Sequence, residues 1–188
     1  DVTYPKKGLP SATLIAMEIK KEIYRCENLI ASAGVSYNKF LAKIASDMDK
    51  PDGFYLIKPE DAEQFLKELE IKRFFGVGKK TEEKMHKLNI YKGHDLKAIP
   101  RDQLIRHFGK IGNYFYDVVR GKDDRPVVSY HESKSIGAER TYDRDLYELD
   151  QVQERLAEVM EIMWSRCKTK KKAGKTLTLK LRFSDFQT

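Results

Sequence analysis

The sequence predicts an α+β protein that is divided into several small domains. Residues 1–57 alternate between helical and strand patterns, and residues 58–121 form short helices separated by glycine and proline. Residues 122–132 have the composition of an extended linker, and residues 133–188 return to a mixture of strand and helix patterns. A chain of 188 residues is long enough for two or three domains of this size.

The first domain, residues 1–57, is expected to be mixed α and β. Residues 1–3 have the pattern of a strand end, and Ser11 is a good N-cap for an amphipathic helix that continues to Arg25. The apolar run 29–35 predicts a buried strand, after which Ser36 is expected to cap a second helix. A Pro-Asp-Gly turn then leads to another strand at residues 54–57. The inner face of the second helix is predicted to comprise Phe40, Leu41, Ile44, Ala45 and Met48.

The second domain, residues 58–121, is predicted to be entirely helical. Its helices are expected at about residues 60–69, 79–88, 94–98, 101–107 and 111–120, with Gly121 beyond the last of them. This region carries most of the positive charge, because residues 58–122 contain 15 basic and 10 acidic side chains, which is five of the net charge of +7. Such an excess favours a polyanionic partner.

The last domain, residues 133–188, is predicted to contain two strands and one long helix. The strands are expected at residues 134–141 and 176–183, and the helix from an Asp150 cap to Cys167. In the second strand, apolar residues alternate with Thr178, Lys180 and Arg182, which predicts one apolar face and one basic face. The helix is predicted to bury Val152, Leu156, Val159, Met160, Met163 and Trp164.

Several functional classes are excluded by the composition. No apolar run approaches the roughly 20 residues of a membrane-spanning helix, and the first residues lack a signal-peptide pattern, so a cytoplasmic location is expected. Cys26 and Cys167 are far apart, which argues against a disulfide framework, and both are predicted to be buried small apolar side chains. The four histidines lack metal-ligand spacing.

The most informative motif is the run from Phe74 to Lys80, FFGVGKK, between two predicted helices. A Walker A loop would need glycine at Arg73 and a hydroxyl side chain at Lys80. A Rossmann fingerprint would need glycine or alanine at Thr81 and a preceding strand, which is absent from the pattern. Both nucleotide-binding motifs are therefore excluded.

The same run fits a helix-hairpin-helix. Two glycines without Cβ atoms allow the backbone N–H groups at the start of the next helix to approach a phosphate, and Lys79 and Lys80 add charge. A β-branched residue at Gly78 is expected to abolish the hairpin. The alternative is an ordinary glycine turn between helices. A second glycine break, Phe108-Gly109-Lys110-Ile111-Gly112, also begins a helix next to a lysine and favours the phosphate-binding interpretation.

These motifs occur in a sequence that resembles a known family. Residues 31–47, ASAGVSYNKFLAKIASD, and the following Lys50-Pro51-Asp52-Gly53 closely resemble the palm-to-thumb junction of Y-family translesion DNA polymerases of the bacterial DNA polymerase IV type. Residues 134–141, KSIGAERT, and 181–186, LRFSDF, resemble the first and third strands of the family's little finger. The helix-hairpin-helix falls where the family's thumb has one. Phe75 is a departure, because the family usually has proline there.

The resemblance implies a partial palm at residues 1–57, a thumb at 58–121, a linker at 122–132 and a truncated little finger at 133–188. It implies a template-directed polymerase that copies past damaged bases with two Mg²⁺ ions and dNTPs and binds a sliding clamp. In that family the fingers and the catalytic carboxylates precede the position of Asp1, and the clamp-binding peptide follows the position of Thr188. The chain is therefore expected to be a fragment that holds no metal ion and does not catalyse alone.

The resemblance also implies roles for individual residues. Lys50 is expected to contact the incoming triphosphate. Contacts with primer-template DNA are expected from Ser36, Lys39, Lys43, Gly76, Val77, Gly78, Lys79, Lys80, Gly109, Lys110, Gly112, Lys134, Ser135, Arg140, Thr178, Lys180 and Arg182.

Two other hypotheses are left open by the residues themselves. One is a stand-alone, non-catalytic helix-hairpin-helix protein that binds DNA as an accessory. The other is a basic domain without a nucleic-acid role. The first shares with the polymerase hypothesis a salt-sensitive, sequence-independent binding to DNA phosphates.

Overall fold

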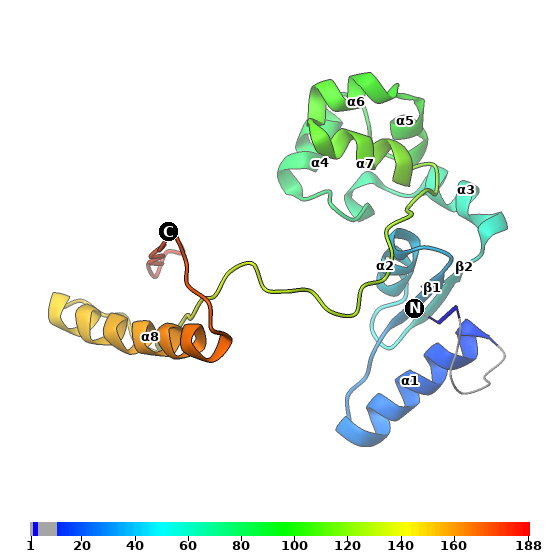
Figure 1. The fold of residues 1–188 in the computed structure, drawn as a ribbon. Coiled ribbons are helices and arrows are strands. Elements are labelled where there is room, and N and C mark those ends of the chain that lie inside the picture. Colours follow the sequence, from blue (N-terminus) through cyan, green and yellow to red (C-terminus); the bar gives the residue numbers. More distant parts are fainter. Residues whose placement is uncertain (1, 4–10) are drawn as a thin grey trace. The chain divides into compact units, whose positions relative to one another are not determined.

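A computed structural model describes residues 2–3 and 11–188, so Asp1 and the strand end that we expect there lie partly outside the described residues. The chain forms two compact units, residues 1–127 and 128–188, each of which has its own internal contacts (Figure 1). The first unit contains helices and a small parallel sheet, and the second contains one long helix.

The first unit begins with helix α1 (Ala12–Glu27), which starts and ends close to the predicted positions. Its N-cap is Ser11, whose side-chain oxygen accepts a hydrogen bond of 3.3 Å from the Leu14 N–H, as the sequence predicts. The chain leaves the helix through Asn28 in the left-handed conformation, with φ of 52°. No residue of α1 is fully buried.

Two short strands follow and form a parallel pair. Strand β1 (Ala33–Ser36) pairs with β2 (Phe54–Ile57), with Ala33 opposite Phe54 and Ser36 opposite Ile57. Helix α2 (Lys39–Met48) is the crossover between them, as parallel pairing requires. The predicted cap at Ser36 is wrong: Ser36 is still in β1, where its hydroxyl donates to the Ile57 carbonyl, and Asn38 caps α2 by accepting from the Leu41 N–H.

Helix α2 supplies the start of the hydrophobic core. Phe40, Leu41, Ile44 and Ala45 are buried as the helical spacing predicts, while Met48 is partly buried at the edge. This core is continuous with the helices that follow, because Leu66, Phe74, Leu104 and Phe115 belong to the same cluster. Residues 39–57 and 58–121 of the first unit therefore share one hydrophobic core.

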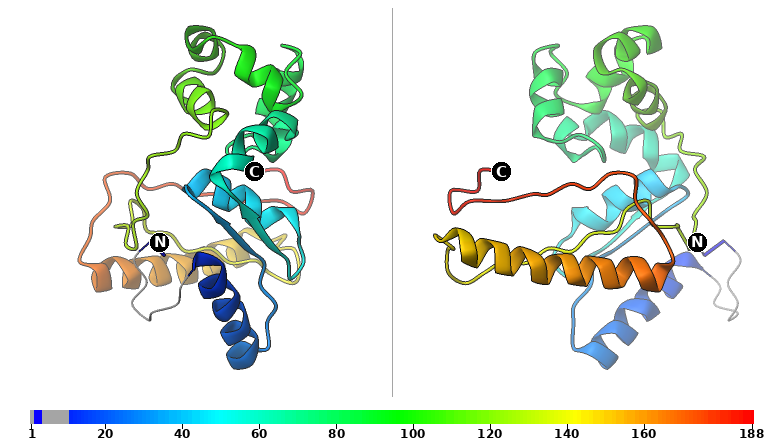
Figure 2. Two further views of the ribbon diagram at one scale, coloured as in Figure 1. Left: turned by 90° about the vertical axis from the view of Figure 1, so that its right-hand side faces the viewer. Right: turned by 60° about the vertical axis from the view of Figure 1, so that its left-hand side comes forward.

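The remainder of the first unit is helical, and its helices begin or end within a few residues of the predicted positions. They are α3 (Pro59–Glu68), the short 3-10 helix η1 (Ile71–Arg73), α4 (Lys79–His86), α5 (Gly93–Ala98), α6 (Arg101–Phe108) and α7 (Lys110–Val118). In both views of Figure 2 the green helices α5 to α7 lie together. Pro59 at the start of α3 and Gly109 between α6 and α7 mark helix boundaries of the expected kind.

The second unit differs from the prediction in its strands. Helix α8 (Leu149–Lys170) is present and is longer than predicted, with Glu148 rather than Asp150 at its N-cap. Within the described residues 128–188 there is no strand, so the strands predicted at 134–141 and 176–183 are wrong for this structure. Alternation of apolar residues describes a face, whereas a strand also needs a partner strand, and neither segment has one among the described residues.

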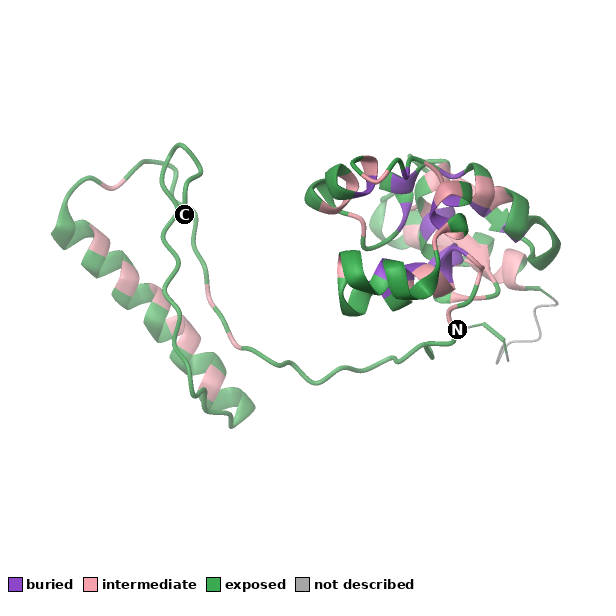
Figure 3. Ribbon diagram, turned by 90° about the horizontal axis from the view of Figure 1, so that it is seen from above, coloured by how far each residue is buried: buried purple, intermediate pink, exposed green. Residues whose placement is uncertain are grey.

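Burial in the second unit is also lower than predicted. Figure 3 shows no buried segment in α8. Met160 and Trp164 are 49% and 60% exposed. Val152, Leu156, Val159 and Met163 are half-buried and lie on one face, so the helical period is right and the degree of burial is wrong. The prediction for the cysteines fails in the same way, since Cys26 is exposed and Cys167 is half-buried.

Candidate nucleic-acid interface

The first glycine turn joins η1 to α4 and is anchored on both sides by the core. Phe74 is 1% exposed and Val77 packs against the core, while the Val77 N–H donates to the Phe74 carbonyl across the turn at 2.9 Å. Gly76 occupies the third position of this turn with φ of +96°, a conformation that residues with a Cβ atom rarely adopt. Gly76 is therefore required by the turn itself.

Gly78 has a different role. Its φ is −89°, which any residue adopts, and a Cβ atom at this position would meet nothing within 4 Å. The expectation that a β-branched residue at Gly78 would abolish the hairpin is therefore wrong, because neither backbone strain nor crowding demands glycine there. What glycine provides is an uncovered backbone at the N-cap of α4.

The N-terminus of α4 presents unused hydrogen-bond donors. The Gly78 carbonyl accepts from the N–H groups of Thr81 and Glu82, both at 2.9 Å. The N–H groups of Gly78, Lys79 and Lys80 have no acceptor among the residues that the structure describes. The ammonium groups of Lys79 and Lys80 also have no carboxylate partner within that part of the chain. Donors and charge therefore coincide at one helix end.

The second glycine turn joins α6 to α7. Gly109 has φ of +66° and serves as both the C-cap of α6 and the N-cap of α7. The N–H groups of Lys110 and Ile111 find no acceptor in residues 11–188. Gly112 is buried, and its Cβ position would lie 2.3 Å from the Leu104 carbonyl oxygen, so this glycine allows α6 and α7 to pack closely. Its N–H donates to the Gly109 carbonyl at 2.9 Å.

The two turns are neighbours. The Cβ position of Gly76 is 3.9 Å from the Ile111 side chain and 3.6 Å from that of Tyr114, so the first turn lies against the first turns of α7. On the other side, the Lys84 ammonium in α4 donates to the His107 carbonyl and lies 5.3 Å from the centre of the Phe108 ring. Two helix N-termini with unused donors thus form one surface, which we call the hairpin surface and define by residues 76–80 and 109–111.

The remaining candidate residues of the first unit lie around α2 and have partners within the chain. Lys43 and Lys50 both contact the Asp47 carboxylate at 2.5 Å, and their hydrogen bonds hold the pKa of Asp47 below its ordinary value. The Lys39 ammonium donates to the Pro126 carbonyl at 3.1 Å. The structure therefore brings Lys43 and Lys50 together, while Lys39 contacts the segment that follows α7.

The candidate residues of the second unit are exposed and are not brought onto one sheet. Lys134, Ser135, Arg140, Thr178, Lys180 and Arg182 all lie in segments without regular structure. The apolar residues between the last three are exposed as well, with Leu179 at 58% and Leu181 at 51%. The structure thus gives no common face for this set.

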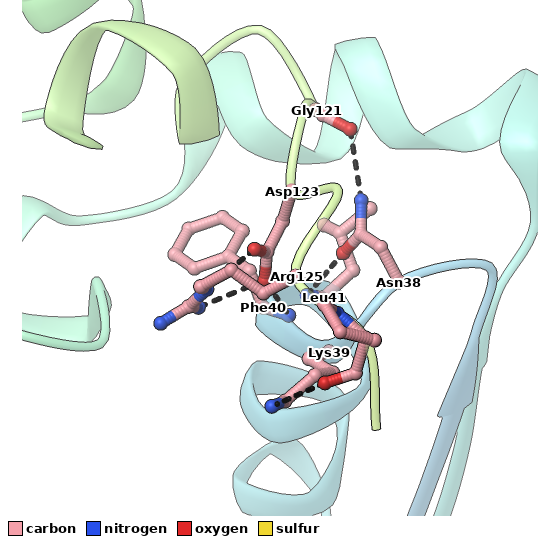
Figure 4. A network of polar contacts seen from close by, with 8 residues as sticks. Asn38, Lys39, Phe40, Leu41, Gly121, Asp123 and Arg125 are labelled. Atoms are coloured by element: carbon pink, nitrogen blue, oxygen red, sulfur yellow. Dashed lines mark hydrogen bonds and ion pairs between the residues drawn. The ribbon is translucent and has the colours of Figure 1, made fainter. Parts of the chain in front are cut away.

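Sequence reasoning missed a polar network at the N-terminus of α2 (Figure 4). Asp123, whose side chain is 2% exposed, accepts from the Phe40 N–H at 3.0 Å and from Arg125 at 2.6 and 2.8 Å. Asn38 donates to the Gly121 carbonyl at 2.8 Å. Residues 121–126, most of which we predict to belong to the linker, are therefore fixed on α2. No short motif signals these contacts, because the partners are 83 residues apart.

Electrostatics in this network favour the ionised form of Asp123. The hydrogen bond from the Arg125 guanidinium, assisted by the Phe40 N–H, keeps the pKa of Asp123 below its ordinary value despite burial. Arg125 also lies 4.9 Å from the centre of the Tyr114 ring. Burial raises the pKa of Tyr114, whose hydroxyl has no hydrogen-bond partner within the described part of the chain.

Two further properties concern metal ions and membranes. The described residues contain no group of three or more histidine, cysteine or acidic side chains positioned to hold a metal ion. None of their helices combines the length and the apolar character needed to cross a bilayer.

Three family models match the chain in order. Residues 1–47 match the impB/mucB/samB family, residues 59–90 match the IMS family HHH motif, and residues 133–188 match the impB/mucB/samB family C-terminal domain. The second match covers the first glycine turn and α4.

Relatives extend over the whole chain. A DNA polymerase IV of Akkermansia muciniphila is 50% identical over 99% of this chain and 52% of its own length. A DNA polymerase IV of Leptospira interrogans is 46% identical over 99% of this chain and 51% of its own length. Among solved structures, a Y-family DNA polymerase chimera is similar with a TM-score of 0.71 at 28% identity, covering 81% of this chain and 44% of the other. The chain spans about half the length of the curated relatives it matches.

The fold, the paired glycine turns and the ordered matches define a helix-hairpin-helix protein of the DNA polymerase class. More particularly, the chain belongs to the Y family of translesion DNA polymerases, of the DNA polymerase IV type. This membership favours the polymerase hypothesis over a stand-alone accessory protein, because the matches extend well beyond the hairpin.

Proposed function

We propose that this chain is a DNA-binding part of a template-directed translesion DNA polymerase, and that the hairpin surface binds the sugar-phosphate backbone of the DNA. The observation that carries the proposal is the uncovered N-terminus of α4, where three backbone donors coincide with two lysines that have no carboxylate partner among the described residues. An anion is the ligand that such a helix end favours, and a phosphate fits both its charge and its donors. Backbone N–H groups recognise phosphates without reading bases.

The second glycine turn provides further backbone donors for the same strand of DNA. The unused N–H groups of Lys110 and Ile111 belong to another helix N-terminus next to the first. Two such ends suit two phosphates of one strand. The roles of Gly76, Val77, Gly109 and Gly112 are then indirect, since they form and pack the turns that place the donors.

The palm-side residues are assigned to the same duplex and to the nucleotide. Lys50 contacts the incoming triphosphate, and Ser36, Lys39 and Lys43 lie near the duplex. In this structure Lys43 and Lys50 share Asp47, so each lysine has to exchange part of that contact for a phosphate oxygen. Lys134, Ser135, Arg140, Thr178, Lys180 and Arg182 contact the template-side backbone once their segments are paired into a sheet.

We assign the chemical step to the whole protein, since the chain spans about half the length of the curated relatives it matches. Two Mg²⁺ ions held by carboxylates of the whole protein would supply charge stabilisation for nucleotidyl transfer, and the described residues group no three such ligands together. The whole enzyme uses dNTPs, acts in the cytoplasm during repair and replication, and binds a sliding clamp. Such a division assigns substrate positioning to the chain described here.

A binding titration tests the proposal. Fluorescence anisotropy with a labelled primer-template duplex, repeated from low to high KCl, should show log K falling by about 0.9 per phosphate contact, with little dependence on sequence. K79Q/K80Q should lower this slope by roughly 1 to 2 and leave the circular dichroism spectrum unchanged. The matched control is K21Q/R25Q on α1, which removes two cations far from the hairpin in sequence. Equal slopes for the two double variants would reject the assignment.

Primer extension tests whether this chain binds DNA without catalysing nucleotide addition. With Mg²⁺ and dNTPs, the 188-residue chain should add no nucleotides, and the polymerase extended to include its fingers and catalytic carboxylates should add them. Incorporation by the chain alone would contradict the proposal.

A further inference from the structure

A groove lies directly beside the hairpin surface, on the side of α2. It has a volume of about 420 Å³ and lies between the C-terminal end of α2 and the first glycine turn. Asp47 and Met48 line it from α2, and Lys72, Arg73, Phe75 and Gly76 line it from η1 and the turn. A volume of this order accommodates a small ligand or a single nucleotide unit.

The groove has a positive charge excess. Lys72 and Arg73 share one carboxylate, Glu70, at 2.9 and 3.9 Å. Asp47, which lines the groove from the other side, is itself shared by Lys43 and Lys50. Each carboxylate therefore faces two cations, and an anion entering the groove meets a net positive environment.

The groove also has an exposed aromatic ring at its edge. Phe75 is 51% exposed, although its neighbour Phe74 is 1% exposed and anchors the turn. The fold gains little from an apolar ring in that position. The Arg73 guanidinium makes its closest polar contact in the groove with the thioether sulfur of Met48, at 3.5 Å, which is a weak acceptor and leaves the guanidinium available for a stronger one.

Continuity with the hairpin surface indicates the occupant. Gly76 lines the groove and also belongs to the hairpin surface, and Phe75 is three residues before Gly78. Three residues extend at most about 11 Å, whereas one strand of DNA advances about 3.4 Å along its axis per nucleotide. A strand held at Gly78 therefore reaches the groove within a few nucleotides.

We propose that this groove is a binding subsite for one nucleotide of the strand that the hairpin surface holds. Lys72 and Arg73 bind its phosphate, and Phe75 packs against its apolar part, which is either the face of an unpaired base or the deoxyribose of a paired one. This inference rests on the proposed function and adds three residues to it. Basic groups alternating with an exposed aromatic ring are the combination that binds nucleic acid without sequence preference.

The test uses the full chain and two labelled DNA ligands, a blunt duplex and a single strand of the same sequence. Affinities of wild type, F75A, F75Y and K72Q/R73Q are measured over a range of KCl concentrations. F75A should weaken binding by about tenfold with an unchanged salt slope, and F75Y should restore it. K72Q/R73Q should lower the salt slope by about 0.9 for each phosphate that the variant no longer neutralises.

The two ligands distinguish the source of the contact with Phe75. A larger loss for F75A on the single strand identifies a base, and an equal loss on both identifies the sugar; either result supports the subsite. The controls are Y24A, which removes another exposed aromatic ring, and K21Q/R25Q, which removes two cations that are also paired with nearby glutamates.

The result that overturns the subsite is binding by F75A and K72Q/R73Q that equals binding by their controls. If K79Q/K80Q still weakens binding in the same assay, the hairpin surface stands and only the groove is rejected. If the wild-type chain binds neither ligand at low salt, the proposed function and the subsite are both rejected.

Discussion

The carboxylate of Asp123 accepts a hydrogen bond of 3.0 Å from the backbone N–H of Phe40, which lies 83 residues earlier in the chain. This bond places a negative charge at the N-terminus of α2 and satisfies one of the helix donors that Asn38 does not reach. The segment that follows α7 is thereby attached to the helix whose lysines, Lys39 and Lys43, we assign to DNA.

Replacing Asp123 should therefore lower the stability of the first unit. D123N removes a nearly buried charge and leaves the Phe40 N–H and Arg125 poorly satisfied, which should lower the free energy of unfolding by about 2–3 kcal/mol. Urea denaturation followed by circular dichroism measures the change. D124N is the matched control, because Asp124 is exposed and should give a change within about 0.5 kcal/mol. A D123N protein as stable as D124N would show that the contact contributes little.

The same carboxylate predicts a dependence on pH. The Arg125 hydrogen bond holds the pKa of Asp123 below its ordinary value in the folded state, whereas an unfolded Asp titrates near 3.9. The stabilisation is therefore fully present above the unfolded pKa and is lost as the pH falls through the lower, folded pKa. The difference between wild type and D123N in urea should be constant above about pH 5 and should shrink below about pH 4. A difference that grows on acidification would contradict this.

The two glycines of the first turn should respond oppositely to alanine. G76A forces a Cβ atom onto a backbone with φ of +96° and should lower the free energy of unfolding by about 1–2 kcal/mol. G78A enters open space at an ordinary φ, so stability should stay the same or rise by up to about 1 kcal/mol. Its added methyl group covers the donors at the start of α4, so G78A should bind duplex more weakly. Thermal melts and anisotropy titrations separate the two effects.

Gly112 should behave as a packing residue. Its Cβ position lies 2.3 Å from the Leu104 carbonyl oxygen, so G112A forces α6 and α7 apart and should lower the free energy of unfolding by about 1–3 kcal/mol. N113A, at the next and exposed position of the same helix, is the control and should be neutral or slightly stabilising. If urea denaturation finds G112A as stable as N113A, α6 and α7 have room for a Cβ atom at position 112, and Gly112 is not required for their packing.

The sequence predicts correctly those structural features that depend on residues close to one another in the chain. The apolar spacing of α2 identified Phe40, Leu41, Ile44 and Ala45, and the glycines at 76 and 109 marked real helix boundaries. The Ser11 cap was found because it depends on residues three positions apart. For α2, the predicted cap Ser36 is instead part of β1, where it lies opposite Ile57 of β2. Asn38 therefore forms the cap.

Predictions failed where a structural feature depends on distant residues. The alternation at residues 176–183 describes a face but does not provide a partner strand, and the described residues contain no strand paired with this segment. The contact of Asp123 with Phe40 joins two segments with no local signal. At the candidate site the sequence predicts the glycines and lysines of the hairpin as contacts with DNA, which stays a prediction. The separate structural roles of Gly76, Gly78 and Gly112 follow only from φ angles and from the space around each Cβ position.

The most direct test of the hairpin surface is to observe its backbone amides. Duplex DNA is titrated into ¹⁵N-labelled protein, and amide resonances are followed by heteronuclear NMR at low salt. We expect the largest shifts at Gly78, Lys79 and Lys80, with further shifts at Lys110 and Ile111, because these N–H groups have no acceptor within the described chain. Shifts elsewhere with these five amides unchanged would contradict the account, since the DNA would then be held by another surface.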